Sequence, residues 1–230
     1  MRLNTRKKPL FIYDWYGTVE APWWTVFMIE QHQERHIAKT EGRKYHPTKT
    51  IAEFKKQHNN RNTLLIPGME ETIRFTGSIG NNVLLSDGDH LDEACPELLA
   101  LSDYFKPWVF NGKVIEFGYK PDAKSKTDPK VAEALIKQFN PDKIFVIGDS
   151  NTEAQFAEVL HADSFIFCGL DIKQITDGKT LPHLEQRVTG HPIIRYIEER
   201  LKDDQPDTSK PEIHQRKQVQ LINANMNVGR

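Results

Sequence analysis

The sequence has little cysteine, little net charge and no long hydrophobic run, and each shortage excludes a class of protein. Its 230 residues include two cysteines, Cys95 and Cys168, whose spacing fits neither a zinc site nor a disulfide framework. The formal net charge of −1 gives no electrostatic footprint for nucleic acid or an anionic membrane. The first apolar run stops at Asp14, too early for a signal peptide, and no run approaches a membrane span. We therefore predict a cytoplasmic protein without nucleic-acid or membrane partners.

Apolar segments alternate with amphipathic segments along most of the chain. The expected strands are 9–14, 82–86, 143–149 and 164–169, with one or two short strands within 107–118. The expected helices are 22–39, 48–58, 69–77, 90–101, 128–139, 151–161 and 191–202. Strands that alternate with helices predict an α/β fold, with a parallel sheet and helices on both of its faces.

Three of the expected strands end in a polar side chain. These side chains are Asp14, Ser86 and Asp149. In parallel α/β sheets the reactive groups collect at the carboxyl ends of the strands. We therefore expect the three side chains to share one site.

Asp14 is followed by Gly17 and Thr18, so the chain delivers a carboxylate at the end of a strand and then turns sharply. A carboxylate in this place suits a nucleophile or a Mg²⁺ ligand. Gly17 permits the positive φ of a tight turn, and the Thr18 hydroxyl can hold developing negative charge. The alternative is an ordinary turn or N-cap aspartate, which is common after a strand.

A second acidic pair, Asp149 and Glu153, lies at the junction of a strand and a helix. Together with Asp14 it would form an oxygen-rich pocket suited to Mg²⁺. The alternative is helix capping, in which Ser150 or Asn151 is the N-cap and Glu153 favours the helix dipole. The two interpretations are compatible.

Phosphoryl chemistry also requires a cation near the substrate anion. Two lysines, Lys120 and Lys126, precede the helix expected at 128–139, and Ser86 could donate to a phosphoryl oxygen. Taken alone, a lysine is more often a solvated surface charge, and the residues themselves leave the choice of lysine open.

Taken in order, these segments resemble the haloacid dehalogenase-like (HAD) hydrolase superfamily. The ordered motifs are Asp14-x-x-Gly17-Thr18, Ser86 after an apolar strand, a lysine before a helix, and Asp149-x-x-x-Glu153. The resemblance implies a Rossmann-like core of residues 1–19 and 65–202 and a small helical cap, residues 20–64, inserted after the first strand. The polar residues 203–230 lack periodicity, so we predict an extended or disordered tail.

The resemblance also implies roles for individual residues. Lys126 fits the superfamily better than Lys120 because its distance to the Ala134–Leu135 helix pair matches the usual spacing. The implied catalytic residues are Asp14 as nucleophile, Thr18, Ser86 and Lys126. The implied substrate-binding residues are Tyr16, Gly17 and Asp87. The implied Mg²⁺ ligands are Asp14, the Tyr16 backbone carbonyl, Asp149 and Glu153.

Tyr16 departs from the pattern, because most phosphatases of this superfamily have a second aspartate there to protonate the leaving group. General acid–base help is worth roughly 10²–10⁴-fold in rate, and a phenol with a pKa of about 10 is a poor replacement. The 2-haloacid dehalogenases resemble Asp-x-Tyr, and the phosphonoacetaldehyde hydrolases resemble Asp-Trp, which matches Trp15. The pair Asp149 and Glu153 favours a metal site over halide displacement.

These observations predict a Mg²⁺-dependent phosphatase that acts on a small phosphorylated metabolite through an aspartyl-phosphate intermediate. The alternatives are a 2-haloacid dehalogenase and an impaired hydrolase kept as a binding protein. In the expected cap, Trp23, Trp24 and Phe27 form a packing face or line a substrate pocket, and packing is the commoner use. The sequence determines neither the substrate nor the oligomeric state.

Overall fold

The computed structural model describes residues 7–88, 94–117, 119–166 and 191–203. The chain divides into two compact units, residues 1–197 and 198–230. The first unit contains the sheet and the candidate site. No helix within the described ranges is long and apolar enough to cross a membrane.

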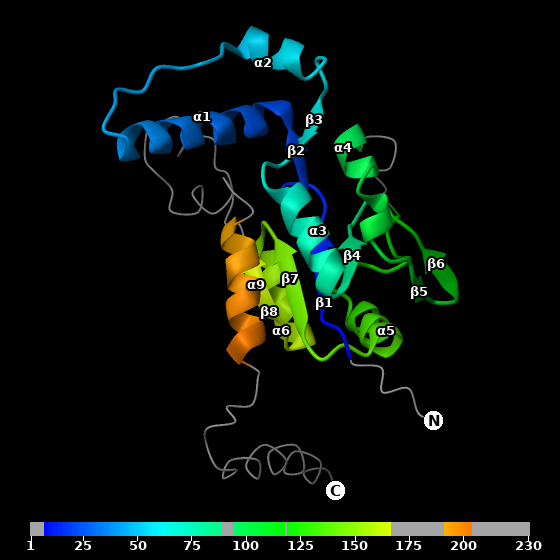
Figure 1. Cartoon of the computed structure of the whole chain (residues 1–230). Helices are drawn as coiled ribbons and strands as arrows, with labels where there is room; N and C mark the ends of the chain where they lie inside the picture. The colour runs from blue at the N-terminus through cyan, green and yellow to red at the C-terminus, as the bar shows by residue number, and fades with distance from the viewer. Residues whose placement is uncertain (1–6, 89–93, 118, 167–190, 204–230) are drawn as a thin grey trace, which may run out of the picture. The chain divides into compact units, whose positions relative to one another are not determined.

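A four-stranded parallel sheet forms the centre of the first unit (Figure 1). Its strands, in spatial order, are β4 (Asn81–Leu85), β1 (Leu10–Asp14), β7 (Ile144–Gly148) and β8 (Asp163–Ile166). Every residue of β1 is buried, because the strand has a neighbour on each side and helices over both faces. The predicted α/β fold with a parallel sheet is confirmed. The last residues of the strand expected at 164–169 lie outside the described ranges.

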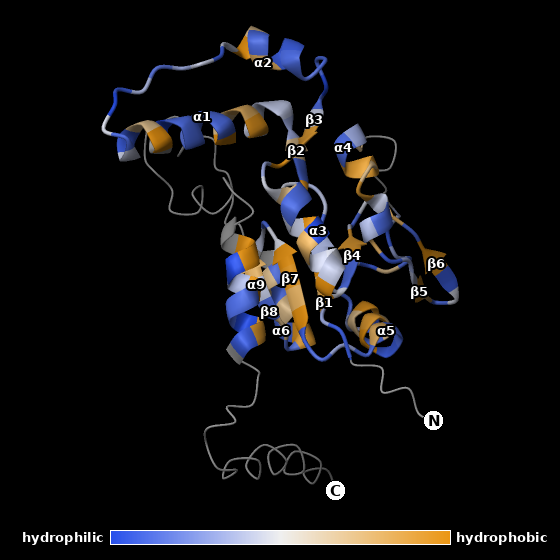
Figure 2. Cartoon of the chain, in the orientation of Figure 1, coloured by the Kyte–Doolittle hydropathy of each residue, from blue (hydrophilic) through white to orange (hydrophobic). Residues whose placement is uncertain are grey.

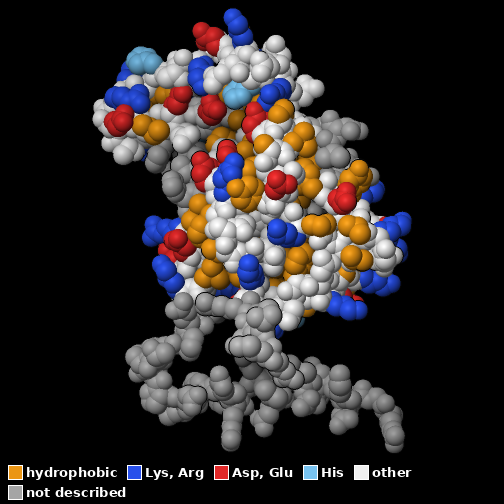
Figure 3. All heavy atoms as spheres, turned by 45° about the vertical axis from the view of Figure 1, so that its right-hand side comes forward, with side chains coloured by type: hydrophobic (Ala, Val, Ile, Leu, Met, Phe, Trp, Pro, Cys, Tyr) orange, Lys and Arg blue, Asp and Glu red, His pale blue; other side chains and the backbone are white. Residues whose placement is uncertain are grey.

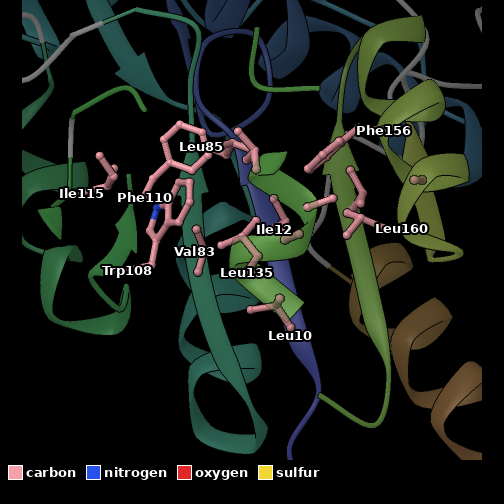
Figure 4. Close-up of a cluster of buried hydrophobic side chains, with 14 residues drawn as sticks. Leu10, Ile12, Val83, Leu85, Trp108, Phe110, Ile115, Leu135, Phe156 and Leu160 are labelled. Carbon is pink, nitrogen blue, oxygen red and sulfur yellow. The ribbon is translucent and has the colours of Figure 1, made fainter. Parts of the chain in front are cut away.

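One face of the sheet packs against α5 (Pro129–Phe139) and α6 (Asn151–Leu160). Figure 4 shows Ile12 of β1 and Val83 of β4 beside Leu135 of α5. The apolar side of α5 turns toward the equally apolar strands (Figure 2). Helix α5 begins at Pro129 after the N-cap Asp128, whose side chain accepts a hydrogen bond from the Lys130 N–H.

The opposite face packs against α3 (Met69–Ile79) and α9 (His191–Asp203). The Tyr13 hydroxyl lies 2.8 Å from the Thr76 hydroxyl of α3. Phe165 of β8 shares this face and contacts the Tyr196 ring of α9 edge to face. Helices therefore cover both sides of the sheet, as the alternating pattern predicts.

Two further short strands, β2 (Glu20–Pro22) and β3 (Thr63–Leu65), pair antiparallel at the base of the inserted segment. Between them lie α1 (Trp23–Thr40) and α2 (Ile51–Gln57). The sequence patterns predict the two helices but not the two strands, because three-residue strands are too short to show a period. In α2 the N-cap is Thr50, which forms a capping box with Glu53.

The expected helix 90–101 is wrong in its extent. The structure has α4 only at Pro96–Leu99, followed by a 3₁₀ turn at Ser102–Tyr104, and residues 89–93 lie outside the described ranges. Pro96 explains the difference: a proline disfavours helical backbone in the residue before it, and Cys95 is extended (φ −68°, ψ 149°). Pro96 starts a new helix rather than continuing one.

The short strands expected within 107–118 form a hairpin, β5 (Trp108–Phe110) and β6 (Lys113–Ile115). Its two-residue turn is Asn111-Gly112, with φ of 50° and 77°, as the common tight hairpin turn requires. The hairpin's inner side chains join the core in Figure 4.

On the face shown in Figure 3, acidic and basic side chains are interspersed. This face therefore carries no extended region of a single charge.

Leu135 supplies a test of the core. Leu135→Ala is expected to lower the free energy of unfolding by about 2–5 kcal/mol, because the side chain is fully buried against the sheet. Ile136→Ala on the same helix is the matched control, since that side chain is 42% exposed, and it should cost about 0.5 kcal/mol or less. Urea unfolding measures both, and equal losses would contradict this packing.

Candidate active site

The candidate site lies at the carboxyl ends of β1 and β7, where a buried lysine joins two carboxylates. Asp14 is the last residue of β1 and is 8% exposed. The Lys126 ammonium lies 2.5 Å from Asp14 Oδ1 and 2.5 Å from Glu153 Oε1. Since Lys126 and Glu153 are 9% and 3% exposed, these ion pairs are largely shielded from water.

Burial and ion pairing have opposite effects on the pKa values of Asp14, Lys126 and Glu153. Burial raises the pKa of Asp14 above its ordinary value, although Lys126 draws it down. Burial alone would lower the pKa of Lys126, but the two carboxylates outweigh it and the pKa is raised. Burial would raise the pKa of Glu153, but hydrogen bonds from Lys126 and Ser150 lower it. The lysine therefore stays charged between the two acids.

Glu153 serves the helix as well as the lysine. Its Oε2 accepts a hydrogen bond from the Ser150 N–H at 3.0 Å and another from the Ser150 hydroxyl. Ser150 is the N-cap of α6 and forms a capping box with Glu153. Of the two candidates for N-cap, Ser150 rather than Asn151 has this role. Capping fixes the Glu153 carboxylate while leaving Oε1 directed to Lys126.

Asp149 completes a group of three acids. One oxygen each from Asp14, Asp149 and Glu153 lies within 4.8 Å of the others. Carboxylate oxygens are the ligands that a hard cation prefers, and three carboxylates converge here. The donor set therefore fits a divalent metal ion such as Mg²⁺.

The turn after Asp14 is tight against Asp149. Gly17 has φ +87°, and its N–H donates to the Glu20 carbonyl at 2.7 Å. A Cβ atom at Gly17 would lie 2.1 Å from Asp149 Oδ2, closer than any real contact. Gly17 is therefore needed both for its backbone conformation and for the close approach of Asp149.

The remaining predicted residues surround the same cavity of about 420 Å³ or support it. The buried Thr18 hydroxyl donates to Asp14 Oδ2 at 3.3 Å. Ser86 lines the cavity, and its hydroxyl accepts from the Gly88 N–H at 3.2 Å. Asp87 also lines the cavity and accepts from the Lys126 backbone N–H at 2.6 Å, which holds the start of the lysine in place.

Between the two candidate lysines, the structure brings Lys126 to Asp14. Lys120 is exposed and is not among the described residues that line the cavity. Tyr16 is 48% exposed and does line it. The predicted site residues thus come together from four segments of the chain.

The sequence matches no protein-family model and no curated protein. Solved structures do show similarity. One is a HAD-superfamily hydrolase, subfamily IA, variant 1, from Geobacter sulfurreducens, with 13% identity over 75% of this chain and 97% of that chain and a TM-score of 0.40. Another is a haloacid dehalogenase-like hydrolase from Streptococcus pneumoniae, with 12% identity over 69% and 83% and a TM-score of 0.39.

A third is a HAD-family enzyme from Bacteroides thetaiotaomicron, solved as a variant with magnesium and inorganic phosphate. Its identity is 11% over 72% of this chain and 96% of that chain, with a TM-score of 0.33. These three structural neighbours are enzymes of the HAD superfamily at low sequence identity.

Glu20 is a site-supporting residue that the sequence patterns do not indicate. It is 1% exposed, and both carboxylate oxygens accept hydrogen bonds: Oε2 from Trp15 Nε1 and Oε1 from the Cys95 N–H, each at 3.2 Å. The carboxylate thus ties the turn after Asp14 to the start of α4. The sequence does contain a sign of this role, because Glu20 lies between the apolar residues Val19 and Ala21. A charged side chain in an apolar stretch needs polar partners if it is buried.

Gly17 gives a direct test of the turn. Gly17→Ala is expected to destabilise the fold and weaken Mg²⁺ binding, because the new methyl group displaces Asp149. Gly42→Ala is the matched control: Gly42 also has positive φ (+67°), but a Cβ atom there meets nothing within 4 Å. In Gly42→Ala the free energy of unfolding should fall only by the cost of a left-handed backbone conformation, roughly 1–2 kcal/mol. Unfolding curves and calorimetric Mg²⁺ titration measure the two effects, and identical behaviour of the variants would contradict the close approach.

Cys95 provides a test of the buried contact between Glu20 and the start of α4. Burial, and then the Glu20 charge, raise the pKa of the Cys95 thiol to about 12. In a Cys168→Ser background we expect iodoacetamide to label Cys95 very slowly at pH 8, with a rate that rises with pH because the thiolate is the nucleophile. The urea-unfolded chain is the control and should label quickly. Rapid labelling of the folded protein at pH 8 would contradict this environment.

Proposed function

We propose that this protein is a Mg²⁺-dependent phosphatase that acts on a small phosphorylated metabolite. The observation that carries the proposal is the buried cluster in which Lys126 bridges Asp14 and Glu153 beside Asp149. A nucleophilic carboxylate, an adjacent cation and a set of metal-binding oxygens are the parts that phosphoryl transfer needs.

Each residue takes the part that its position suits. Asp14 attacks phosphorus and forms an aspartyl-phosphate, while Thr18 and Lys126 hold the Asp14 carboxylate in place. Ser86 and the Lys126 ammonium bind the transferred phosphoryl group, and Gly17 and Asp87 shape the cavity that receives it.

Mg²⁺ would be held by Asp14, the Tyr16 carbonyl, Asp149 and Glu153. When bound, it would neutralise the charge on the phosphoryl oxygens. Residues 20–64 act as a cap over this site in the same proposal, and the protein works in the cytoplasm.

A 2-haloacid dehalogenase remains the second candidate, because Tyr16 follows Asp14 at the spacing of the Asp-x-Tyr motif. Halide leaves without a proton and needs no metal. The group of three carboxylates within 4.8 Å favours the phosphatase, since halide displacement has no use for it.

The proposal is tested with a panel of phosphate esters and 2-chloropropionate, each with and without Mg²⁺. We expect phosphate release that requires Mg²⁺ and falls by at least about 10³-fold in Asp14→Asn, which removes the nucleophile. Asp142→Asn, at an exposed position before β7, is the control and should keep full activity. Activity that ignores Mg²⁺ or survives Asp14→Asn would refute the proposal, and halide release without metal would establish the second candidate.

A further inference from the structure

A second and larger cavity, of about 1000 Å³, adjoins the site at Tyr16, which lines both. Its other walls come from the start of α1, from residues 61–63 and from the start of α4. The second cavity therefore neighbours the site on the side of Tyr16.

Three aromatic residues, Tyr16, Trp23 and Trp24, are among the residues that line the second cavity. Tyr16 is 48% exposed and Trp24 is 37% exposed, and Trp23 lies beside them in the sequence. Of the three aromatic residues expected to pack or to line a pocket, Phe27 packs edge to face on Phe54, and the Lys55 ammonium lies 4.6 Å from the centre of the Trp23 ring. Trp23 and Trp24 also line the cavity. Large exposed aromatic side chains around a hollow indicate a place for a flat apolar ligand.

The cavity offers little free charge among its described lining residues. The Arg61 guanidinium donates to both oxygens of Glu97, at 2.6 and 2.7 Å, so its charge is already paired. The Cys95 thiol is neutral, because burial raises its pKa to about 12. A strongly charged leaving group would therefore find no unpaired partner there.

Hydrogen bonds hold the walls together. Buried Glu20 joins the turn after Asp14 to Cys95 through its two carboxylate oxygens. The Trp23 N–H donates to the Asn62 carbonyl at 2.9 Å, which ties the start of α1 to the segment before β3. These hydrogen bonds connect three of the segments that line the cavity.

The chemistry at position 16 points to the same kind of ligand. Position 16 carries a phenol and not the carboxylic acid that would protonate a departing oxygen. An alkoxide leaving group, which is nearly as basic as hydroxide, needs such a proton donor. A phenolate, whose conjugate acid has a pKa of about 10, departs with far less help.

We propose, as an extension of the phosphatase function and resting on it, that the substrate is a phosphate monoester of an aryl alcohol. Its ring lies in the cavity of Tyr16, Trp23 and Trp24. The Asp14 carboxylate oxygen bonds to phosphorus as the bond from phosphorus to the aryl oxygen breaks. The aryl oxide leaves with the electron pair and takes a proton from water. Water then attacks phosphorus, loses a proton to solvent, and releases inorganic phosphate and the Asp14 carboxylate.

Four substrates separate the effect of an aromatic ring from the effect of a good leaving group. Phenyl phosphate has a ring and a good leaving group, and benzyl phosphate has a ring and a poor one. Acetyl phosphate has a good leaving group without a ring, and ethyl phosphate has neither. Hydrolysis of the aspartyl-phosphate is common to all four substrates, so the first step is measured in a single turnover. We expect the leaving group to be released at least about 10²-fold faster from phenyl and acetyl phosphate than from benzyl and ethyl phosphate. We expect a lower KM for the two substrates with a ring.

Two variants test the ring contact and the missing proton donor separately. Trp24→Ala should raise KM about 3–10-fold for phenyl and benzyl phosphate and leave acetyl phosphate unchanged, because only the ring contact is lost. Ile37→Ala, an exposed position on the same helix, is the control and should change nothing. Tyr16→Asp should raise kcat for benzyl and ethyl phosphate more than for phenyl phosphate, since it supplies a carboxylic acid.

The outcomes distinguish the inference from the function beneath it. The Asp14→Asn variant is the blank for every substrate. If Mg²⁺- and Asp14-dependent hydrolysis occurs but phenyl is no better than benzyl phosphate, or Trp24→Ala affects acetyl and phenyl phosphate equally, the aryl inference is overturned and the phosphatase stands. If none of the four is hydrolysed while other esters of the panel release phosphate with Mg²⁺, the aryl inference is overturned and the phosphatase stands. If no ester of either set is hydrolysed, both fail.

Discussion

A buried lysine between two buried acids is the interaction on which the rest of this site depends. Asp14 ends β1, Lys126 precedes α5 and Glu153 lies in the first turn of α6, so one ammonium group joins three elements. Without it, two shielded carboxylates would repel each other beside Asp149, and removal of one partner from a buried pair typically costs about 3–5 kcal/mol. The fold can tolerate this concentration of acids because Lys126 is held there, and Asp87 holds its backbone.

The turn after Asp14 connects the candidate site to the segment between β1 and α3. The turn after Asp14 places Gly17 against Asp149, and within a few residues the chain reaches Glu20, whose carboxylate binds Trp15 and Cys95. Tyr16, which lies within this turn, lines both cavities. In the proposed function, the absence of a carboxylic acid at position 16 and the aromatic residues of the second cavity indicate the same class of substrate.

Much of the fold could be predicted because the decisive signals are local. The strand 9–14 is apolar up to one acid, and helix 128–139 begins with Asp128 and Pro129, so both are recognisable from neighbouring residues alone. The patterns failed where the signal was short or interrupted. Strands β2 and β3 have three residues each, and Pro96 starts α4 later than the helix expected from residue 90.

The sequence by itself determined the longer helices and strands, the parallel arrangement of the sheet and the group of polar residues at the strand ends. These features could be predicted because periodicity and the residue that ends a strand are visible in consecutive positions. Only the tertiary structure decided that Lys126 rather than Lys120 reaches Asp14, that Ser150 and Glu153 serve the helix and the ion pair together, and that Glu20 binds Cys95. These contacts join residues far apart in the chain, and their distances depend on how helices and loops pack on the sheet, which no local pattern specifies.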